Sequence, residues 1–384
     1  PDMVTFSPDG RYVLVANEGE PSDDYLADPE GSITIISLAR GIANITEADV
    51  RHARFTEFTR ANLSPMIRIY GPNASVAQDL EPEYIAVSPD SRTAWVTLQE
   101  NNALAVVDIE QARVTAVVPL GFKDHSLPGN GLDASDRDNR INIANWPVLG
   151  MYQPDAITPL TVGGRTYLLT ANEGDARAYG GFSEERRVGE LRLDPTAFPN
   201  GDELKNNANI GRLRTTDALG DTDGDGDFDR IYTYGARSFS VWGTDGTLLW
   251  DSGDQFETIA AINTPQSFNV SNTDNTVDSR SDDKGPEPEA IVTGIVNGRP
   301  YAFIGTERQG SIMVYDMSEP ANPRFAGVFS NRDTTAGIAS PAAGDLGPEG
   351  IIFIPAADSS NGRPLLVVAS EISGTTTVWE IRAQ

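Results

Sequence analysis

Carboxylates recur at two fixed points of a repeated sequence unit. Five units begin with proline and an acidic residue, and a second acid follows the next apolar run. The first acids are Asp2, Glu83, Asp155, Glu289 and Glu349, and the second acids are Glu18, Glu100, Glu173, Glu307 and Glu371. Oxygen-only ligand sets favour hard cations such as Ca²⁺, and crowded like charges raise one another's pKa. The sequence therefore predicts a site for several Ca²⁺ ions, if the units bring these acids together. The alternative is that each acid caps backbone N–H groups in its own unit.

A second carboxylate motif lies in one acidic loop. Asp221, Asp223, Asp225 and Asp229 stand at loop positions 1, 3, 5 and 9, and Gly226 at position 6 permits the turn. An EF-hand would need Glu at position 12, where Tyr232 stands. The shorter Asp-x-Asp-x-Asp-Gly-x-x-Asp form is similar to loops between propeller strands in integrin-like repeats. It predicts a structural Ca²⁺ site, and a solvated acidic turn is the alternative.

Few histidines are present that could act as a general acid or base. His52 and His125 are the two histidines, and His52 falls in a segment predicted to be helical, so His125 is the candidate imidazole for proton transfer. A hydrogen-bonded structural role is the alternative for a single loop histidine. The chain has no Gly-x-Ser-x-Gly elbow, no Walker loop and no His-Glu-x-x-His, which disfavours serine hydrolases, nucleotide-binding proteins and zincins.

Two basic residues directly precede one of the Pro-acid starts. Arg280 and Lys284 lie in a charged run that leads into Glu289, where they could hold a phosphate group beside metal-binding acids. On this interpretation Glu289 and Glu349 belong to the catalytic centre. A solvated charge run is the alternative.

Composition narrows the functional classes. The chain has 384 residues, a formal net charge of −27, 39% hydrophobic residues and no cysteine. Such a charge argues against binding to nucleic acid or to an anionic membrane surface. The lack of cysteine excludes disulfides, thiolate zinc sites and cysteine nucleophiles. No apolar run is long enough to predict a transmembrane helix.

The repeated unit predicts the fold. Each unit has short apolar runs separated by turns such as Ser7-Pro8-Asp9-Gly10 and Asn361-Gly362, which is typical of antiparallel hairpins. Repetition of whole units around a ring predicts an all-β fold, a β-propeller, with a β-sandwich or solenoid as the alternative. In a propeller the acids of each unit would return to one rim of the central channel.

Six units are recognisable, and they are treated as one propeller domain spanning residues 1–384. The approximate units are 1–72, 82–120, 154–195, 229–253, 287–330 and 347–384, and the fourth lacks the Pro-acid start. The insertions are 38–72, 121–150 and 255–285. A helix is predicted around residues 47–59 and a strand around 66–70. Since the sequence opens inside a strand, we expect it to be N-terminally truncated, with seven or eight blades in the intact protein.

Long segments of the chain also resemble a known family. The segments are GPNASVAQDLEPEYIAVSPD, TLQENNALAVVDI, GFKDHSLPGNGLDASDRD, TANEGDARAY, GDTDGDGDFDRIYTYGARSFSVW, DSRSDDKGPEPEA and LGPEGIIFIPAADSSNGRPLLVVASEISGTTTVWEI. They are similar to the choice-of-anchor I family of bacterial surface or secreted propellers, some of which are named alkaline phosphatase. The Pro-Glu-Gly starts also resemble, more distantly, phytase-like propellers, which hold Ca²⁺ and phosphate at the channel mouth.

Two functions follow as expectations. The first is a metal-dependent phosphoesterase that acts on a phosphate ester at the acidic rim, with the protein secreted or on the cell surface. The second is a non-catalytic surface scaffold or adhesion propeller that binds a protein or a glycan. An acidic cytosolic protein fits the composition almost as well.

Overall fold

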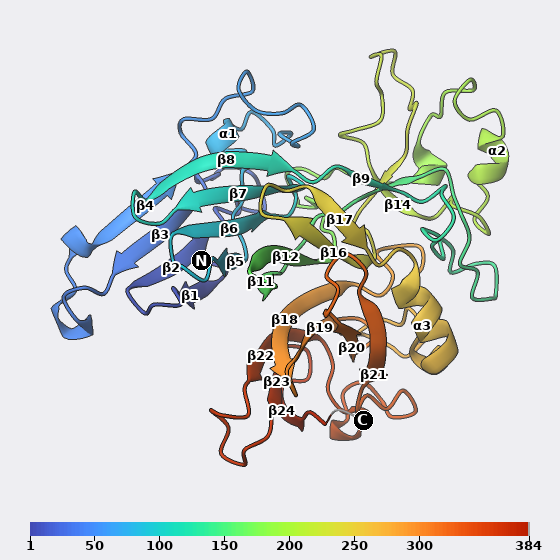
Figure 1. The fold of residues 1–384 in the computed structure, drawn as a ribbon. Coiled ribbons are helices and arrows are strands. Elements are labelled where there is room, and N and C mark those ends of the chain that lie inside the picture. The colour runs from blue at the N-terminus through green and yellow to red at the C-terminus, as the bar shows by residue number, and fades with distance from the viewer. Residues whose placement is uncertain (383–384) are drawn as a thin grey trace.

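The chain folds as an all-β propeller in which five blade sheets follow one another. In the computed structural model, which describes residues 1–382, each blade is antiparallel and is built outward from its first strand. Figure 1 shows the blades succeeding one another from the blue N-terminal sheet to the red C-terminal sheet. Consecutive blades contact each other through their inner strands.

The blades have the following strands. Blade 1 contains β1 (Val4–Phe6), β2 (Tyr12–Asn17), β3 (Ser32–Ser37) and β4 (Val50–Arg54). Blade 2 contains β5 (Ile85–Val87), β6 (Thr93–Leu98), β7 (Ala103–Asp108) and β8 (Arg113–Pro119). Blade 3 contains β11 (Ile157–Val162), β12 (Arg165–Asn172), β16 (Ser238–Gly243) and β17 (Leu248–Asp251). Blade 4 contains β18 (Pro288–Val296), β19 (Arg299–Thr306), β20 (Ser311–Asp316) and β21 (Arg324–Phe329). Blade 5 contains β22 (Pro348–Ile354), β23 (Leu365–Ser370) and β24 (Thr375–Glu380).

Turn chemistry fixes the first hairpins of blades 1 and 2 in the same way. Ser7 Oγ donates a hydrogen bond to Asp9 Oδ1 at 2.7 Å, and Ser88 Oγ donates to Asp90 Oδ1 at the same distance. The fourth position of each turn has a positive φ, which suits Gly10 and which Ser91 adopts at 60°. The repeated Ser-Pro-Asp sequence therefore sets the hairpin register twice.

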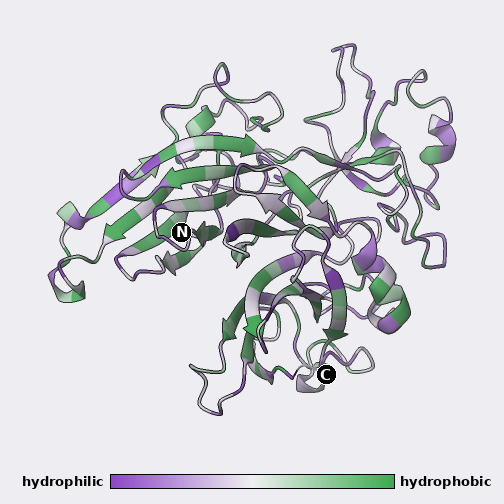
Figure 2. Ribbon diagram, in the orientation of Figure 1, coloured by the Kyte–Doolittle hydropathy of each residue, from purple (hydrophilic) through white to green (hydrophobic). Residues whose placement is uncertain are grey.

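Apolar residues at alternate strand positions form the core between blades. One cluster joins blades 1 and 2, a second joins blades 3 and 4, and a third joins blades 4 and 5. Figure 2 shows the hydrophobic colour concentrated on the blade strands and the hydrophilic colour on loops. The blades are thus held together by burial of the faces of successive sheets.

The predicted third and fourth units are one blade, so residues 1–382 form five blades where six were predicted. β12 pairs with β16 from Tyr167↔Gly243 to Asn172↔Ser238, across the intervening residues 173–237. Units 154–195 and 229–253 therefore contribute two strands each to blade 3. The repeat pattern missed this because the pairing partners are far apart in sequence.

The helix predicted around residues 47–59 is also wrong. Residues Glu47–Asp49 form a single 3₁₀ turn, and Val50–Arg54 form β4, which pairs with β3 and completes blade 1. His52 lies on this strand, with Nδ1 3.0 Å from Thr34 Oγ1. The strand predicted around 66–70 is absent from the described residues, where this stretch is irregular. Pairing at the sheet edge outweighed local helix propensity.

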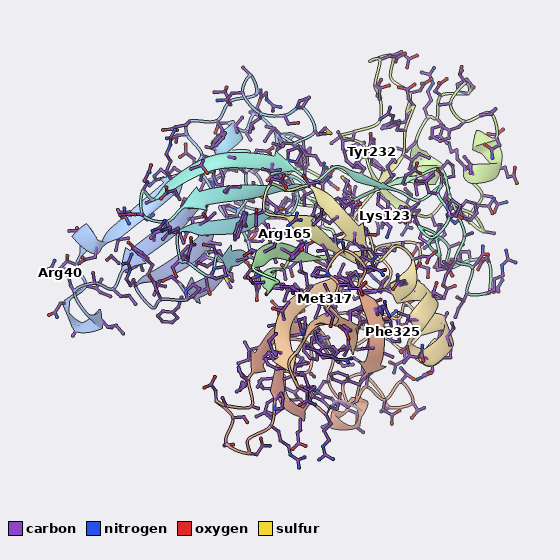
Figure 3. All side chains as sticks on the ribbon, in the orientation of Figure 1. Arg40, Lys123, Arg165, Tyr232, Met317 and Phe325 are labelled. Atoms are coloured by element: carbon purple, nitrogen blue, oxygen red, sulfur yellow. The ribbon has the colours of Figure 1, made fainter. Side chains whose placement is uncertain are left out.

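Residues 121–150 and 173–237 pack as a layer of their own beside blades 2 and 3. This layer contains β9 (Phe122–Asp124), β10 (Leu149–Met151), β13 (Glu185–Arg187), β14 (Arg214–Thr216), β15 (Tyr232–Thr233) and α2 (Gly201–Leu204). Two other helices, α1 (Val76–Asp79) and α3 (Gln255–Asn263), pack instead in the cores of blades 1 and 2 and of blades 3 and 4. The layer's own apolar core includes Leu132, Val148 and Phe198. Lys123 on β9, labelled in Figure 3 near Tyr232, joins this layer to blade 3. Its buried Nζ lies 2.9 Å from the Ala236 carbonyl and 3.1 Å from Asp251 Oδ1.

Candidate functional site

A backbone kink precedes the first acid in three of the blades. Gln153, Glu287 and Gly347 have φ values of 40°, 50° and 72° and stand directly before the prolines of the Pro-acid starts. A register shift follows Pro288 in blade 4 and Pro348 in blade 5. Positive φ is strained for Gln and Glu, and such strain gathers at functional sites. These kinks and bulges re-aim the first acids out of the ladder.

The first acids converge as the sequence predicts. Burial raises the pKa of Asp155, and nearby Glu173, Asp2 and Glu349 raise it further. The pKa of Glu289 is likewise raised by burial first and then by acids that include Asp155 and Glu349. Carboxylates from all five blades thus lie close enough to repel one another. Glu349 and Glu371 are exposed, whereas Glu83, Glu100 and Glu173 are buried.

Three of these acids form a group that we call the cation-free cluster: Glu18, Glu83 and Glu100. Ligand oxygens of all three lie within 4.8 Å of one another. No Lys, Arg or His side chain among residues 1–382 forms a salt bridge with any of them. Glu83 Oε2 and Glu100 Oε2 are buried without a hydrogen-bond partner. Buried charges are normally paired or bound to metal, so this cluster lacks a directly paired counter-charge.

The electrostatics of the cation-free cluster agree with that deficit. Burial raises the pKa of Glu18 to about 7, and Glu20 and Asp2 add to the effect. Burial raises the pKa of Glu100 to about 7, although the charge of nearby Arg177 opposes this rise. Burial and then Glu100 raise the pKa of Glu83 well above its usual value. A bound divalent cation would favour the ionised forms and supply the missing charge.

A second group of acids, buried or half-buried, forms the cation-paired cluster: Asp155, Glu173, Glu287, Glu289 and Glu307. Two overlapping groups within it, Asp155–Glu173–Glu289 and Glu173–Glu287–Glu307, each have ligand oxygens within 4.8 Å of one another. Lys284 Nζ lies 2.7 Å from Glu173 Oε1 and 3.3 Å from Glu287 Oε2. The protein therefore supplies a cation to this cluster itself.

Two arginines complete the pairing around Glu287. Arg280 lies 2.6 Å from Glu287 Oε1, and Arg308 lies 3.0 Å from both Glu287 Oε2 and Glu307 Oε2. Burial alone would raise the pKa of Glu287, but Lys284, Arg280 and Arg308 hold it at about 2. The predicted phosphate ligands Arg280 and Lys284 do lie at the rim, but their charges are directed at Glu287.

Glu81 and Glu287 are site residues that the repeat pattern missed. Blades 2 and 4 carry a doubled start, Glu81-Pro82-Glu83 and Glu287-Pro288-Glu289. In each triplet the first Glu pairs with arginine, and the Oε2 of the second Glu is buried without a partner. The Glu-Pro-Glu repetition was a visible signal for this pair of roles.

Arg177, from the insertion inside blade 3, is the partner of Glu81. Its guanidinium lies 3.0 Å from Glu81 Oε1, bonds to Asp79 Oδ1, and stacks 4.6 Å from the Tyr70 ring centroid. Burial raises the pKa of Glu81 to about 9, and Glu100 adds to this rise while Arg177 opposes it. Through Glu81, the insertion therefore stabilises the segment that carries Glu83 of the cation-free cluster.

His125 is not brought to either cluster. It is buried, its Nδ1 lies 2.7 Å from the Asn130 carbonyl, and its Nε2 has no hydrogen-bond partner. Burial, together with nearby Lys123, lowers its pKa well below the usual value. Within the described chain none of its hydrogen bonds reaches a rim acid, so the geometry favours the structural alternative.

The acidic loop lies in the insertion, between β14 and β15, apart from the clusters. Oxygens of Asp221, Asp223 and Asp225 lie within 4.8 Å of one another, and all three residues are exposed. Asp229 Oδ2 instead accepts a hydrogen bond from the Thr222 N–H at 2.8 Å. Three of the four predicted ligands therefore face one point.

Comparison with known proteins places the chain in a family. A family model, the choice-of-anchor I domain, matches residues 1–320. Gigasin-3a from Magallana gigas is 33% identical over 192 residues, which cover 47% of this chain and 67% of that protein. A mesenchyme-specific cell surface glycoprotein from Strongylocentrotus purpuratus is 28% identical over 298 residues, which cover 68% of this chain and 38% of that protein.

Solved structures show weaker likeness. The periplasmic gluconolactonase of Pseudomonas aeruginosa has a TM-score of 0.39 at 12% identity, covering 100% of this chain and 72% of its own. The Cps50 β-propeller domain of Myceliophteria thermophila has a TM-score of 0.36 at 9% identity, covering 99% and 82%. Scores this low carry no argument about activity.

Proposed function

The chain belongs to the choice-of-anchor I domain family, and from this premise we propose that it is a Ca²⁺-binding surface propeller. Family membership fits a cell-surface or secreted protein, and no helix in residues 1–382 is long and apolar enough to cross a membrane. The observation that carries the metal assignment is the pair of buried, partnerless oxygens in the cation-free cluster. They belong to a cluster with a third glutamate, and no Lys, Arg or His side chain among residues 1–382 forms a salt bridge with it.

The donor set suits calcium rather than a transition metal. Glu18, Glu83 and Glu100 offer carboxylate oxygens only, which is the ligand chemistry of Ca²⁺ and Mg²⁺. Ca²⁺ tolerates irregular geometry and bidentate carboxylates, whereas Mg²⁺ demands near-octahedral order. The exposed Asp221–Asp223–Asp225 group is a second candidate, with a structural role in its own loop.

Isothermal titration of the chelator-treated protein with CaCl₂ tests the proposal. We expect Glu83→Gln and Glu100→Gln each to weaken the rim site by roughly ten- to a hundredfold, as for loss of a charged partner worth about 1.5–3 kcal/mol. Glu110→Gln, on an exposed turn, is the matched control and should bind as the wild type does. Unchanged binding in the Glu83 and Glu100 variants would exclude this cluster as the site.

On this basis the propeller acts as a rigid, metal-stabilised scaffold that presents its insertions to a protein or glycan. The scaffold is favoured over the enzyme because Arg280 and Lys284 are occupied by Glu287 and Glu173. His125, the one candidate imidazole, is buried away from the rim.

A metal-dependent phosphoesterase is the second candidate. Its support is Glu289 Oε2, which is buried without a partner beside Asp155 and Glu173. Hydrolysis of p-nitrophenyl phosphate with and without Ca²⁺ tests it, and Glu289→Gln and Glu349→Gln should abolish any turnover. Absence of turnover in the wild type would leave the scaffold as the function.

A further inference from the structure

The loop between β2 and β3 begins at the cation-free cluster. It covers residues 19–31, directly after Glu18, and we call it the lid loop. A Cβ built on Gly31, its last residue, would lie 2.9 Å from the Glu18 carbonyl oxygen and 2.6 Å from Pro82. Pro82 directly precedes Glu83. Only glycine fits so close a contact, which holds the base of the lid loop between two glutamates of the cluster.

The tip of the lid loop is docked on the insertion inside blade 3. Asp23 Oδ1 accepts a hydrogen bond from the Gly180 N–H at 2.8 Å, and the Asp23 carbonyl accepts one from the Gly181 N–H at 2.7 Å. The Tyr179 hydroxyl donates to Glu20 Oε1 at 3.2 Å. A Cβ on Gly181 would lie 2.7 Å from backbone atoms of the lid loop, so this docking also depends on a glycine.

Aromatic rings pack at the same contact. Tyr25 of the lid loop lies edge-on to Tyr179 and Phe182 of the insertion, with ring centroids 5.5 and 5.6 Å apart. All three rings are half-buried. Burial raises the pKa of Tyr179, and the charges of Glu100 and Glu81 raise it further, because the ring lies close to both acids. The docked contact therefore lies next to the cation-free cluster.

Solvent reaches the cluster from the side of the lid loop. Glu83 and Glu100, from blade 2, are 6% and 5% exposed, whereas Glu18 is half-buried. Because the lid loop starts at the residue after Glu18, movement of the loop and movement of this ligand are coupled through the backbone. Opening of the tip breaks only its contacts with the insertion, so it needs no unfolding of a blade.

We propose that the lid loop controls release of the bound ion from the cation-free cluster, and that Asp23 holds the loop closed. This inference rests on the proposed function, since the ion is the Ca²⁺ assigned to Glu18, Glu83 and Glu100. A bound ion draws Glu18 toward the two blade 2 glutamates and favours the docked loop. Because such coupling is reciprocal, the docked loop in turn retains the ion. Asp23 acts through Glu18 and is a positioning residue.

Hydrogen exchange of residues 178–183 tests the link between the ion and the lid loop. Two amides of this segment donate to Asp23, and they lose these bonds when the tip opens. We expect saturating CaCl₂ to slow exchange here by roughly tenfold or more in the wild type. The Glu83→Gln/Glu100→Gln protein, which lacks two of the ligands, should show no such change.

The rate of Ca²⁺ release tests the role of Asp23. Ca²⁺-loaded protein is mixed with a fluorescent chelator, in an Asp225→Asn background that removes the exposed-loop site. Asp23→Ala and Gly181→Ala should each speed release by roughly tenfold or more, within the usual range of coupling between sites. The midpoint of urea unfolding in EDTA should stay close to that of the parent, which a merely structural role would not predict.

Glu30→Ala is the matched control for lost charge. It removes a carboxylate from the same loop, at a position that faces Arg54 of blade 1, and should release Ca²⁺ at the parental rate. Equal acceleration in this variant would refute the proposal, because lost charge would then explain the effect. If Gly181→Ala fails to fold, Asp23→Ala decides the outcome.

The results separate this inference from the metal assignment. Suppose that titration shows Ca²⁺ binding which depends on the cluster glutamates. Exchange at residues 178–183 that is indifferent to Ca²⁺, or parental release rates in both lid variants, would then refute the lid and leave the metal site intact. Absence of binding that depends on Glu83 and Glu100 would overturn both proposals.

Discussion

The two carboxylate clusters arise from the same sequence unit but are neutralised in different ways. In the cation-paired cluster, Lys284, Arg280 and Arg308 surround Glu287 and reach Glu173 and Glu307. In the cation-free cluster, Glu83 and Glu100 are equally buried, and no basic side chain in the described structure bridges them. The nearest basic partner, Arg177, is directed to Glu81 and Asp79.

The difference shows that the position of an acid in the repeat does not determine whether it pairs with a protein cation. The role depends on whether a neighbouring loop contributes a cation. The segment between α3 and β18 contributes Lys284 and Arg280 to the cation-paired cluster. The insertion inside blade 3 contributes Arg177, which pairs with Glu81 and Asp79 and not with an acid of the cation-free cluster. Where the protein supplies a cation, the acids form structural salt bridges. Where it does not, the acids are free to bind a metal ion.

Removal of the protein cation is expected to have the largest effect. Lys284→Met leaves Glu173 with an uncompensated buried charge, while Glu287 keeps Arg280 and Arg308, and the change should destabilise the protein by about 3–5 kcal/mol. Urea unfolding in EDTA measures this, with Arg11→Met at an exposed site as the control. The double variant Lys284→Met/Glu173→Gln should regain part of the loss. A Lys284→Met protein as stable as the wild type would show that the salt bridges of Lys284 do not stabilise the fold.

A fall in pH should have the next largest effect on stability, and it should act through the cation-paired cluster. The folded pKa of Glu287 is about 2, below the usual 4.5, so its ionised form stabilises the fold. That contribution is present above pH 4.5 and is lost as the pH falls toward 2, with a size on the order of 3 kcal/mol. Unfolding midpoints between pH 5 and 2 in EDTA should fall less steeply for Glu287→Gln than for the wild type. Parallel curves would contradict the pKa assignment.

Ca²⁺ should stabilise the protein through the cation-free cluster and not through the cation-paired cluster. At a hundred times the Kd, Ca²⁺ should stabilise the wild type by about 2.7 kcal/mol through linkage. Glu83→Gln/Glu100→Gln should lose most of this increment, whereas Glu307→Gln should keep it. Thermal melts with and without Ca²⁺ measure the difference. An increment lost in Glu307→Gln but kept in the double variant would reverse the comparison.

The smallest effect is expected in the exposed loop. Asp225→Asn should change stability by no more than about 0.5 kcal/mol without metal, as for most surface substitutions. With Ca²⁺, the variant should lose slowed amide exchange in residues 221–229 and keep binding at the rim. Exchange that is indifferent to Ca²⁺ in the wild type would identify the loop as a solvated acidic turn.

Much of the fold, and part of the site, could be read from the sequence. The Pro-acid starts and Ser-Pro-Asp turns predicted a propeller with acids on one rim, because both depend on local patterns. The all-β propeller is confirmed. The pairing of β12 with β16 was not predictable, since no local signal marks strands separated by residues 173–237. Nor was the pairing of Arg308 with Glu287, because only the folded rim brings the two together.

The division of blade 3 has a consequence for how the chain folds. The ladder between β12 and β16 must wait until residues 173–237 have returned the chain to the same sheet, and closing so long a loop carries an entropic penalty. The insertion's own apolar core shortens the effective loop if it forms first. Blade 3 should therefore be the last sheet to gain protection during refolding, after blades 1, 2 and 4, whose strands are joined by shorter connections.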